Sequence, residues 1–306
     1  MCDFIYSLLI LIMSKIIQEI KKGRVLVSDG AWGTFLQKKG LKPGECPEEW
    51  NISKPDDVFE IAQSYVNAGA DMIETNSFGG SYFKLKNYGF ETRVFEINKA
   101  AAEISRKAAG PDRFVLGSIG PTGKLLIMEE VTEDELYNAF KEQSMALEAG
   151  GADAIVIETM TDLEEARIAV KAAKENTSCE VICTMTFDKI IGGEYRTMMG
   201  ISPTEMTEAL VEAGAEVIGA NCGNGIADMI GIVKEIRRAN ATIPILIHAN
   251  AGMPHYHDGE TTFPESPNDM AARVKEIVAA GANIIGGCCG TTPDHICEVR
   301  HVVNSL

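Results

Sequence analysis

The chain has 306 residues, enough for one large domain or two small ones, and its composition of 45% hydrophobic and 24% charged residues is that of a globular protein with a sizeable core. Its 28 basic and 44 acidic residues give a formal net charge of −16, which disfavours nucleic acid and anionic membranes as partners and leaves small molecules or proteins. Eight cysteines without a disulfide-framework spacing or a convincing signal peptide predict a reducing, cytoplasmic compartment, where thiols bind metal or pack.

Residues 1–21 are predicted to be an N-terminal extension, disordered or helical. The apolar run over residues 4–13 lacks the basic start and the small-residue cleavage site of a signal peptide, and it is too short to span a bilayer. We favour an upstream start-codon extension with the natural start at or near Met13. A packed helix and a membrane-tethering segment are the alternatives.

From residue 22 onward, short apolar runs rich in β-formers alternate with longer segments of helical periodicity, as in parallel βαβ units. Helices are expected, among others, over residues 56–67, 133–148, 163–174 and 268–279. The predicted strands cover residues 25–28, 72–75, 114–118, 154–158, 181–187, 217–221, 245–249 and 284–287. Eight strand–helix alternations predict a closed barrel, so residues 22–306 are assigned to a single (β/α)8 TIM barrel of the α/β class.

A recurring turn supports this assignment. The sequences AGAD, AGGAD, AGAE and AGAN occur at residues 68–71, 149–153, 213–216 and 280–283, before the second, fourth, sixth and eighth predicted strands. Glycine is expected to end each helix in a left-handed conformation, which makes the repeat structural rather than ligand-binding.

Catalytic groups of such barrels lie at the carboxyl ends of the strands, where this sequence places polar or thiol residues repeatedly. The strongest pattern is Cys288-Cys289 between glycines, together with Cys222 at the end of the sixth predicted strand. Neighbouring side chains of a regular strand point to opposite faces, but Gly286, Gly287 and Gly290 are expected to allow unusual backbone angles that turn both thiols inward. Three cysteine ligands and one open position predict a catalytic Zn²⁺ site.

Other interpretations of the cysteines and histidines are weaker. A vicinal disulfide or a redox pair of Cys288 and Cys289 would leave Cys222 unexplained. The remaining cysteines are expected to pack or to lie at the surface. His248, inside an apolar strand, is interpreted as a hydrogen-bonded core residue. A metal-free barrel lyase and a non-catalytic zinc-binding subunit remain alternative classes.

Seven motifs closely resemble the homocysteine S-methyltransferase family, and most of all the homocysteine-binding barrel of cobalamin-dependent methionine synthase. The resemblance covers nearly the whole chain after residue 22, and its last motif is highly specific. The motifs are DGAWGTFLQ (29–37), GADMIETNSFGG (69–80), GSIGPTGK (117–124), IETMTDLEEA (157–166), GANCGNG (219–225), HANAGMP (248–254) and GGCCGTTPDHI (286–296).

The resemblance implies that Cys222, Cys288 and Cys289 bind zinc and that the thiol of homocysteine takes the fourth position. Zinc coordination deprotonates a thiol that is mostly protonated at neutral pH, and thiolate ligands keep the bound sulfur electron-rich enough to attack a methyl group. Trp32 stands where the methionine synthase motif usually has Met, so methylation of another thiol is an alternative.

The amino-acid end of the substrate needs its own contacts. Asp29 and Glu158 leave the first and fourth strands as carboxylates on one barrel face, where we expect them to pair with the α-ammonium group, as the matching family residues do. The N–H groups at Gly30 to Trp32 are expected to bind the α-carboxylate, with Thr75 and Ser118 as supporting donors. The structural alternatives are a turn-forming Asp29 and a helix-capping Glu158.

Two further predictions concern the metal and the methyl donor. The amide oxygen of Asn250, between the cysteine-bearing strands, is expected to cap the metal until thiol displaces it; the alternative is a turn-forming asparagine. Only one helix is predicted after the eighth strand, so methylcobalamin or another corrinoid is expected only on a separate partner protein. A small onium donor, betaine or S-methylmethionine, is the alternative.

Overall fold

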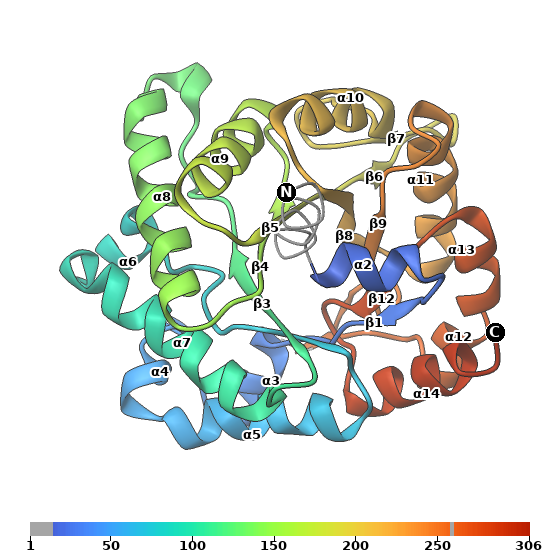
Figure 1. The fold of residues 1–306 in the computed structure, drawn as a ribbon, viewed down its shortest axis with the longest axis horizontal. Coiled ribbons are helices and arrows are strands. Elements are labelled where there is room, and N and C mark those ends of the chain that lie inside the picture. The colour runs from blue at the N-terminus through green and yellow to red at the C-terminus, as the bar shows by residue number, and fades with distance from the viewer. Residues whose placement is uncertain (1–14, 258–259) are drawn as a thin grey trace, which may run out of the picture.

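A computed structural model describes residues 15–257 and 260–306 of the chain as a TIM barrel (Figure 1). Its strands form one eight-stranded sheet in the order β1-β12-β9-β8-β5-β4-β3-β2, with every pairing parallel. The bounds of these strands are β1 Leu26–Val27, β2 Met72–Glu74, β3 Phe114–Ile119, β4 Ala154–Met160, β5 Glu180–Met185, β8 Val217–Gly225, β9 Ile245–Asn250 and β12 Ile284–Gly287. The predicted fold is therefore confirmed.

Two hydrogen bonds join the two edges of this sheet. The N–H of Asp71, directly before β2, donates to the carbonyl of Val27 in β1 at 2.7 Å, and the Asp71 carboxylate accepts from the Val27 N–H at 2.9 Å. Because β1 and β2 are the edge strands of the sheet, these bonds complete the circle.

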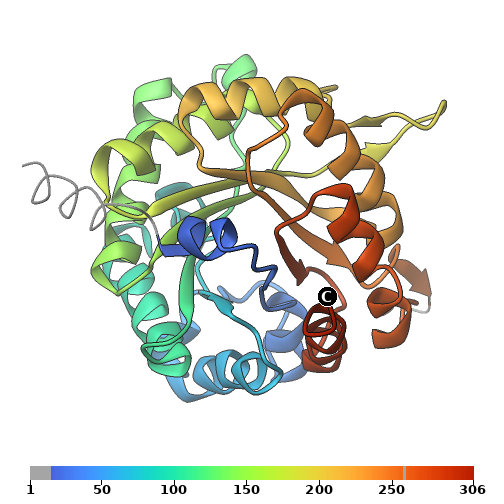
Figure 2. The same cartoon turned by 45° about the vertical axis from the view of Figure 1, so that its right-hand side comes forward.

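Helices surround the strands on the outside (Figures 1 and 2). Their bounds are α3 Gly33–Lys38, α4 Trp50–Ser53, α5 Pro55–Asn67, α6 Tyr82–Lys86, α7 Val94–Ala109, α8 Glu133–Ala149, α9 Leu163–Asn176, α10 Pro203–Ala213, α11 Ile226–Ala239, α12 Pro267–Ala271, α13 Val274–Ala280 and α14 Pro293–Val303. Several begin at a capping box, as Thr132 and Glu135 form at the start of α8. No helix among the described residues is long and apolar enough to cross a membrane.

The glycines of the four recurring turns have the left-handed backbone that the sequence predicted. Their φ angles are 93° at Gly69, 100° at Gly151, 98° at Gly214 and 121° at Gly281. A residue with a side chain would be strained at these positions, which explains why the same turn recurs between helix and strand.

A short helix, α2 Lys15–Lys21, closes the amino-terminal mouth of the barrel (Figure 1). Ile16 is fully buried among the first inward-facing residues of the strands, and the Glu180 carboxylate accepts from the N–H groups of Ile16 and Ile17 at 3.2 and 2.9 Å. Part of the predicted extension is thus helical and packed on the barrel, whereas residues 1–14 lie outside the described residues. The division of the chain at residue 21 stays a prediction.

Two details differ from the predicted elements. The single helix expected over residues 268–279 is divided into α12 and α13 by a turn at Ala272 and Arg273. Two short hairpins were not predicted, and they extend the loops after β5 and β9 (Figure 2). They pair β6 Asp188–Lys189 with β7 Tyr195–Arg196, and β10 His255–His257 with β11 Glu260–Thr262.

Candidate active site

A cavity of about 300 Å³ opens at the carboxyl ends of the strands, where a TIM barrel carries its chemistry. The carboxyl ends of β2, β3, β4, β8, β9 and β12 and the segments that follow β1, β2 and β12 contribute to its wall. Eight of the ten predicted site residues line it: Gly30, Trp32, Thr75, Ser118, Glu158, Cys222, Cys288 and Cys289. Asp29 and Asn250 lie behind the wall, and both are buried.

The three predicted cysteines converge at one end of this cavity. Their sulfur atoms all lie within 4.8 Å of one another, and the sulfurs of Cys222 and Cys289 are 3.9 Å apart. Among the described residues this is the only group of three or more His, Cys, Asp or Glu side chains with such a spacing. Three sulfur donors within this distance match the donor set of a zinc site that keeps one open position.

Local backbone conformation turns these thiols toward one another. Cys222 has a φ of 59°, which is uncommon for a residue with a side chain, and Gly223 follows with 71°. In β8 the side chain of Asn221 faces the barrel interior, so a regular strand would point Cys222 outward. The left-handed residue removes this alternation and brings the Cys222 sulfur to the site.

The glycines around Cys288 and Cys289 act differently from what was predicted. Of the three glycines expected to have unusual angles, only Gly290 has one, with a φ of 81°. Gly286 and Gly287 are required for another reason, because a side chain at either position would clash with a neighbouring residue. A Cβ on Gly286 would lie 2.7 Å from Cδ2 of His248, and a Cβ on Gly287 would lie 2.2 Å from Oγ1 of Thr291.

The three thiols lie close enough to shift one another's pKa values. Hydrogen bonds from the Cys288 and Cys289 thiols lower the pKa of Cys222, while the same contacts raise the pKa values of Cys288 and Cys289. The arrangement thus favours one thiolate supported by two thiols. A hydrogen bond from the side chain of Asn250 also lowers the pKa of Cys222. Oδ1 of Asn250 has no hydrogen-bond partner among the described residues although it is buried.

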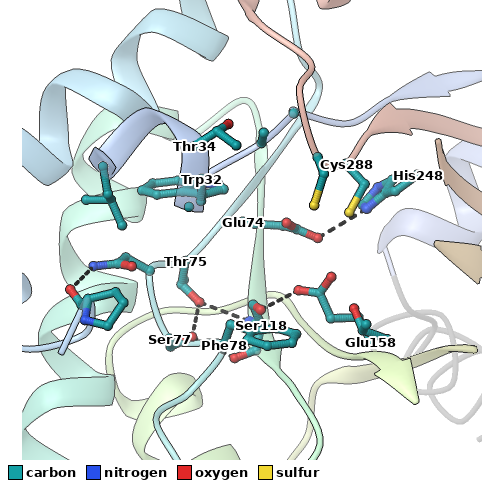
Figure 3. Close-up of a pocket in the computed structure, with 18 of the residues that line it drawn as sticks. Trp32, Thr34, Glu74, Thr75, Ser77, Phe78, Ser118, Glu158, His248 and Cys288 are labelled. Atoms are coloured by element: carbon teal, nitrogen blue, oxygen red, sulfur yellow. Dashed lines mark hydrogen bonds and ion pairs between the residues drawn. The ribbon is translucent and has the colours of Figure 1, made fainter. Parts of the chain in front are cut away.

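Glu158 and Ser118 form a hydrogen-bonded pair in the cavity wall (Figure 3). Ala154 and Val156 fill the barrel interior, so Glu158 follows on the same inward face of β4. One carboxylate oxygen accepts from the Ser118 hydroxyl, and the other accepts from Asn221 Nδ2 at 3.2 Å. Burial, together with repulsion from Glu74, raises the pKa of Glu158 to about 8.

Asp29 lies just beyond β1 and is fully buried. Its Oδ2 accepts from Trp32 Nε1 at 2.9 Å and from the N–H of Glu74 at 2.9 Å. Burial and the charge of Glu74 raise the pKa of Asp29 to about 8. The carboxylate therefore joins the loop after β1 to the end of β2.

Thr75 and Ser118 connect the ends of β2 and β3. The Thr75 hydroxyl accepts from the Ser118 N–H at 2.9 Å and lies 2.6 Å from the Ser77 hydroxyl. The Ser77 hydroxyl donates to the Ser118 carbonyl at 2.7 Å. Both predicted donors thus lie at the cavity, where their hydroxyl groups also hold the wall together.

Two further polar residues of the cavity are Glu74, which was not among the predicted site residues, and His248, which was interpreted as a hydrogen-bonded core residue (Figure 3). Oε1 of Glu74 lies 3.3 Å from Nδ1 of His248, and both side chains are buried. Burial raises the pKa of Glu74 to about 8 and lowers that of His248. The signal that identifies them is strand alternation, because Met72 and Leu246 face the interior two residues earlier.

Comparison with known proteins agrees with this geometry. The sequence matches the homocysteine S-methyltransferase family over residues 26–303. It is 32% identical over 302 residues to a methionine synthase of Mycobacterium tuberculosis and 33% identical over 294 residues to one of Mycobacterium leprae. These alignments cover 94% and 92% of this chain but 25% and 24% of the relatives, so the chain spans about a quarter of their length.

The fold is similar to that of the homocysteine methyltransferase MmuM from Escherichia coli. The metallated form of MmuM superimposes with a TM-score of 0.75 at 20% identity, covering 92% of this chain and 97% of MmuM. The apo form gives a TM-score of 0.71 over the same shares of the two chains.

Proposed function

The chain belongs to the homocysteine S-methyltransferase family, and we propose that it methylates the thiol of homocysteine to form methionine. The observation that carries this proposal is the convergence of three cysteine sulfurs at one end of a cavity whose wall also holds buried carboxylates. No lysine or arginine is among the described residues that line this cavity. A small thiol with an ammonium group fits such an environment, because its sulfur and its positive charge both find complementary groups.

We propose Cys222, Cys288 and Cys289 as the ligands of a catalytic zinc ion. The donor set fits zinc, and the unpaired Oδ1 of Asn250 beside Cys222 supports the proposal that this amide oxygen is the fourth ligand until a thiol arrives. When bound, zinc would deprotonate the substrate thiol and keep its sulfur nucleophilic.

We propose that the substrate's amino-acid end is bound by Glu158 and by the segment that follows β1. Glu158 is fixed by Ser118 and Asn221, and it reaches the cavity wall, so it contacts the α-ammonium group directly. Asp29 lies behind the wall and contributes to substrate binding indirectly. It holds Trp32 and the backbone of Glu74 in position through hydrogen bonds. The backbone from Gly30 to Trp32 lines the cavity; the Ala31 N–H donates to Thr291 Oγ1 at 3.1 Å, so the N–H groups of Gly30 and Trp32 are proposed to bind the α-carboxylate.

We propose a separate methyl-corrinoid protein as the methyl donor. Both mycobacterial relatives are methionine synthases, whose chains extend far beyond the matched segment. Exposed apolar side chains are concentrated on the loops that follow the strands, where a donor protein would approach the cavity. Among these, Ile127 is 76% exposed, Met128 65%, Ile191 fully, Met198 81% and Tyr256 77%. A cytoplasmic location is part of the same proposal.

A donor panel tests the proposed reaction. Zinc-loaded protein and homocysteine are incubated with methylcobalamin, a methylated corrinoid protein, betaine, S-methylmethionine or S-adenosylmethionine, and methionine formation is measured. We expect turnover with the corrinoid donors and none with the onium compounds. Efficient turnover with betaine or S-methylmethionine and none with either corrinoid would contradict the proposed donor, whereas no methionine from any donor would contradict the proposed reaction.

A further inference from the structure

Three carboxyl groups, those of Asp29, Glu74 and Glu158, converge beside the cysteines, and their hydrogen bonds differ. Asp29 and Glu158 both accept hydrogen bonds from neighbouring side chains. The buried Oε1 of Glu74 accepts no hydrogen bond of good geometry from the described residues, and it lies 3.3 Å from Nδ1 of His248. Since buried polar groups are almost always hydrogen-bonded, a carboxylate whose contact is a long one to an imidazole can take a further partner from a bound ligand.

The backbone of Glu74 holds the side chain in place without using the carboxylate. Its N–H donates to Asp29 Oδ2 at 2.9 Å, and its carbonyl accepts from the Ser105 hydroxyl at 2.8 Å. The side chain then points inward from β2, toward the space between Cys288 and Glu158 (Figure 3). A group presented in this way is ready to bind a ligand and is not needed to hold the wall together.

The charge around Glu74 identifies the kind of ligand. The nearest basic group is the imidazole of His248, 3.3 Å away, and no lysine or arginine is among the described residues that line the cavity. The carboxyl groups of Asp29 and Glu158 are both affected by repulsion from Glu74. A positive group of the ligand would relieve this repulsion, whereas an anionic or neutral group would not.

We propose that Glu74 is a specificity-determining residue, which together with Glu158 binds the ammonium group of the thiol substrate and restricts the site to amino thiols. This inference rests on the proposed function and assigns to Glu74 the direct contact that the sequence suggested for Asp29. The two glutamates lie on different strands, β2 and β4, and both line the cavity near the cysteines. One ammonium group carries three N–H donors and so pairs with both carboxylates at once.

The test compares two thiols that differ only in the ammonium group, homocysteine and 4-mercaptobutanoate. Their affinities for zinc-loaded protein are measured by calorimetry for the wild type, Glu74→Gln and Glu74→Asp. A hydrogen bond to a charged group is worth roughly a ten- to hundredfold change in affinity. Glu74→Gln should weaken homocysteine binding by about that factor and leave 4-mercaptobutanoate unchanged, while Glu74→Asp, which keeps the charge, should retain part of the preference for homocysteine.

Glu165→Gln is the matched control. Glu165 is also a buried glutamate, but it accepts hydrogen bonds from Thr122 and does not line the cavity, so both affinities should stay at the wild-type values. Equal losses for both thiols in Glu74→Gln, or no loss for either, would overturn this inference alone. Failure of the zinc-loaded wild type to bind either thiol would instead overturn the proposed function and this inference with it.

Discussion

The indole nitrogen of Trp32 donates a hydrogen bond of 2.9 Å to the carboxylate of the buried Asp29. The same carboxylate oxygen accepts from the backbone of Glu74. Trp32 therefore does more than form one wall of the cavity, because it holds the group that joins the ends of β1 and β2. Trp32 of the motif at residues 29–37 is thus connected, through Asp29, to Glu74 of the motif at residues 69–80.

Trp32→Phe should reveal this connection. Phenylalanine keeps an aromatic ring but removes the N–H donor, so Asp29 loses one of its partners in a buried position. We expect the free energy of unfolding to fall by about 1–3 kcal/mol and homocysteine to bind more weakly. Urea unfolding and calorimetric titration measure the two effects. Unchanged values in both would show that the hydrogen bond contributes nothing to the site.

Metal content distinguishes the three converging cysteines from the others. Replacing Cys222, Cys288 or Cys289 by Ala should remove most zinc, because two sulfur ligands hold the ion far less tightly than three. Cys297→Ala is the control, since Cys297 lies on α14 and does not line the cavity. Zinc per protein chain is measured after dialysis against a weak chelator. Full zinc content in any of the three single variants would remove that cysteine from the proposed ligand set.

A separate prediction concerns the position of Asn250 in the protein without substrate. In a crystal structure of the zinc-loaded, thiol-free protein, its Oδ1 should lie about 2.0–2.2 Å from the metal. In the complex with homocysteine the amide should have left the metal. An amide oxygen far from zinc in the thiol-free structure would favour the simpler role of a turn residue before Ala251 and Gly252.

The buried carboxyl groups predict how stability depends on pH in the metal-free protein. Burial raises the pKa values of Asp29, Glu74 and Glu158 to about 8 in the folded chain, whereas unfolded carboxyl groups titrate near pH 4. Between about pH 4 and about pH 8 the folded state thus binds more protons than the unfolded state. The free energy of unfolding therefore falls as the pH rises from about 4 to about 8.

Urea unfolding at pH 5 and pH 8 measures this effect. The wild type should be more stable at pH 5, and Glu74→Gln should show a smaller difference between the two pH values because one titrating group is absent. Equal pH dependence in the wild type and the variant would mean that Glu74 is ionised in the folded protein at both pH values.

Much of this site follows from strand alternation alone. Once β4 begins at Ala154 with an inward side chain, Glu158 must face the interior, and the same counting from Met72 identifies Glu74. The counting fails at Cys222, where a positive φ reverses the direction of the side chain. The cysteine pattern itself predicted the convergence there, although the space requirements of Gly286 and Gly287 depend on contacts with His248 and Thr291 that are distant in sequence.

Other features depend on tertiary contacts that no local pattern encodes. Asp29 is predictable as a residue at a strand end, but its position behind the cavity wall follows from its bonds to Trp32 and Glu74. The packing of Ile16 into the barrel mouth depends on Glu180, more than 160 residues later in the chain. Short hairpins such as β6–β7 are also hard to predict, because two-residue strands carry little periodicity.

The central claim is that a substrate thiol enters a three-cysteine zinc site, and zinc-edge X-ray absorption tests it most directly. Without thiol, the spectrum should fit three sulfur ligands and one lighter ligand, which we assign to Cys222, Cys288, Cys289 and Asn250. Addition of homocysteine should change the fit to four sulfurs. A spectrum that is unchanged by homocysteine, or that has fewer than three sulfur ligands before its addition, would contradict the account.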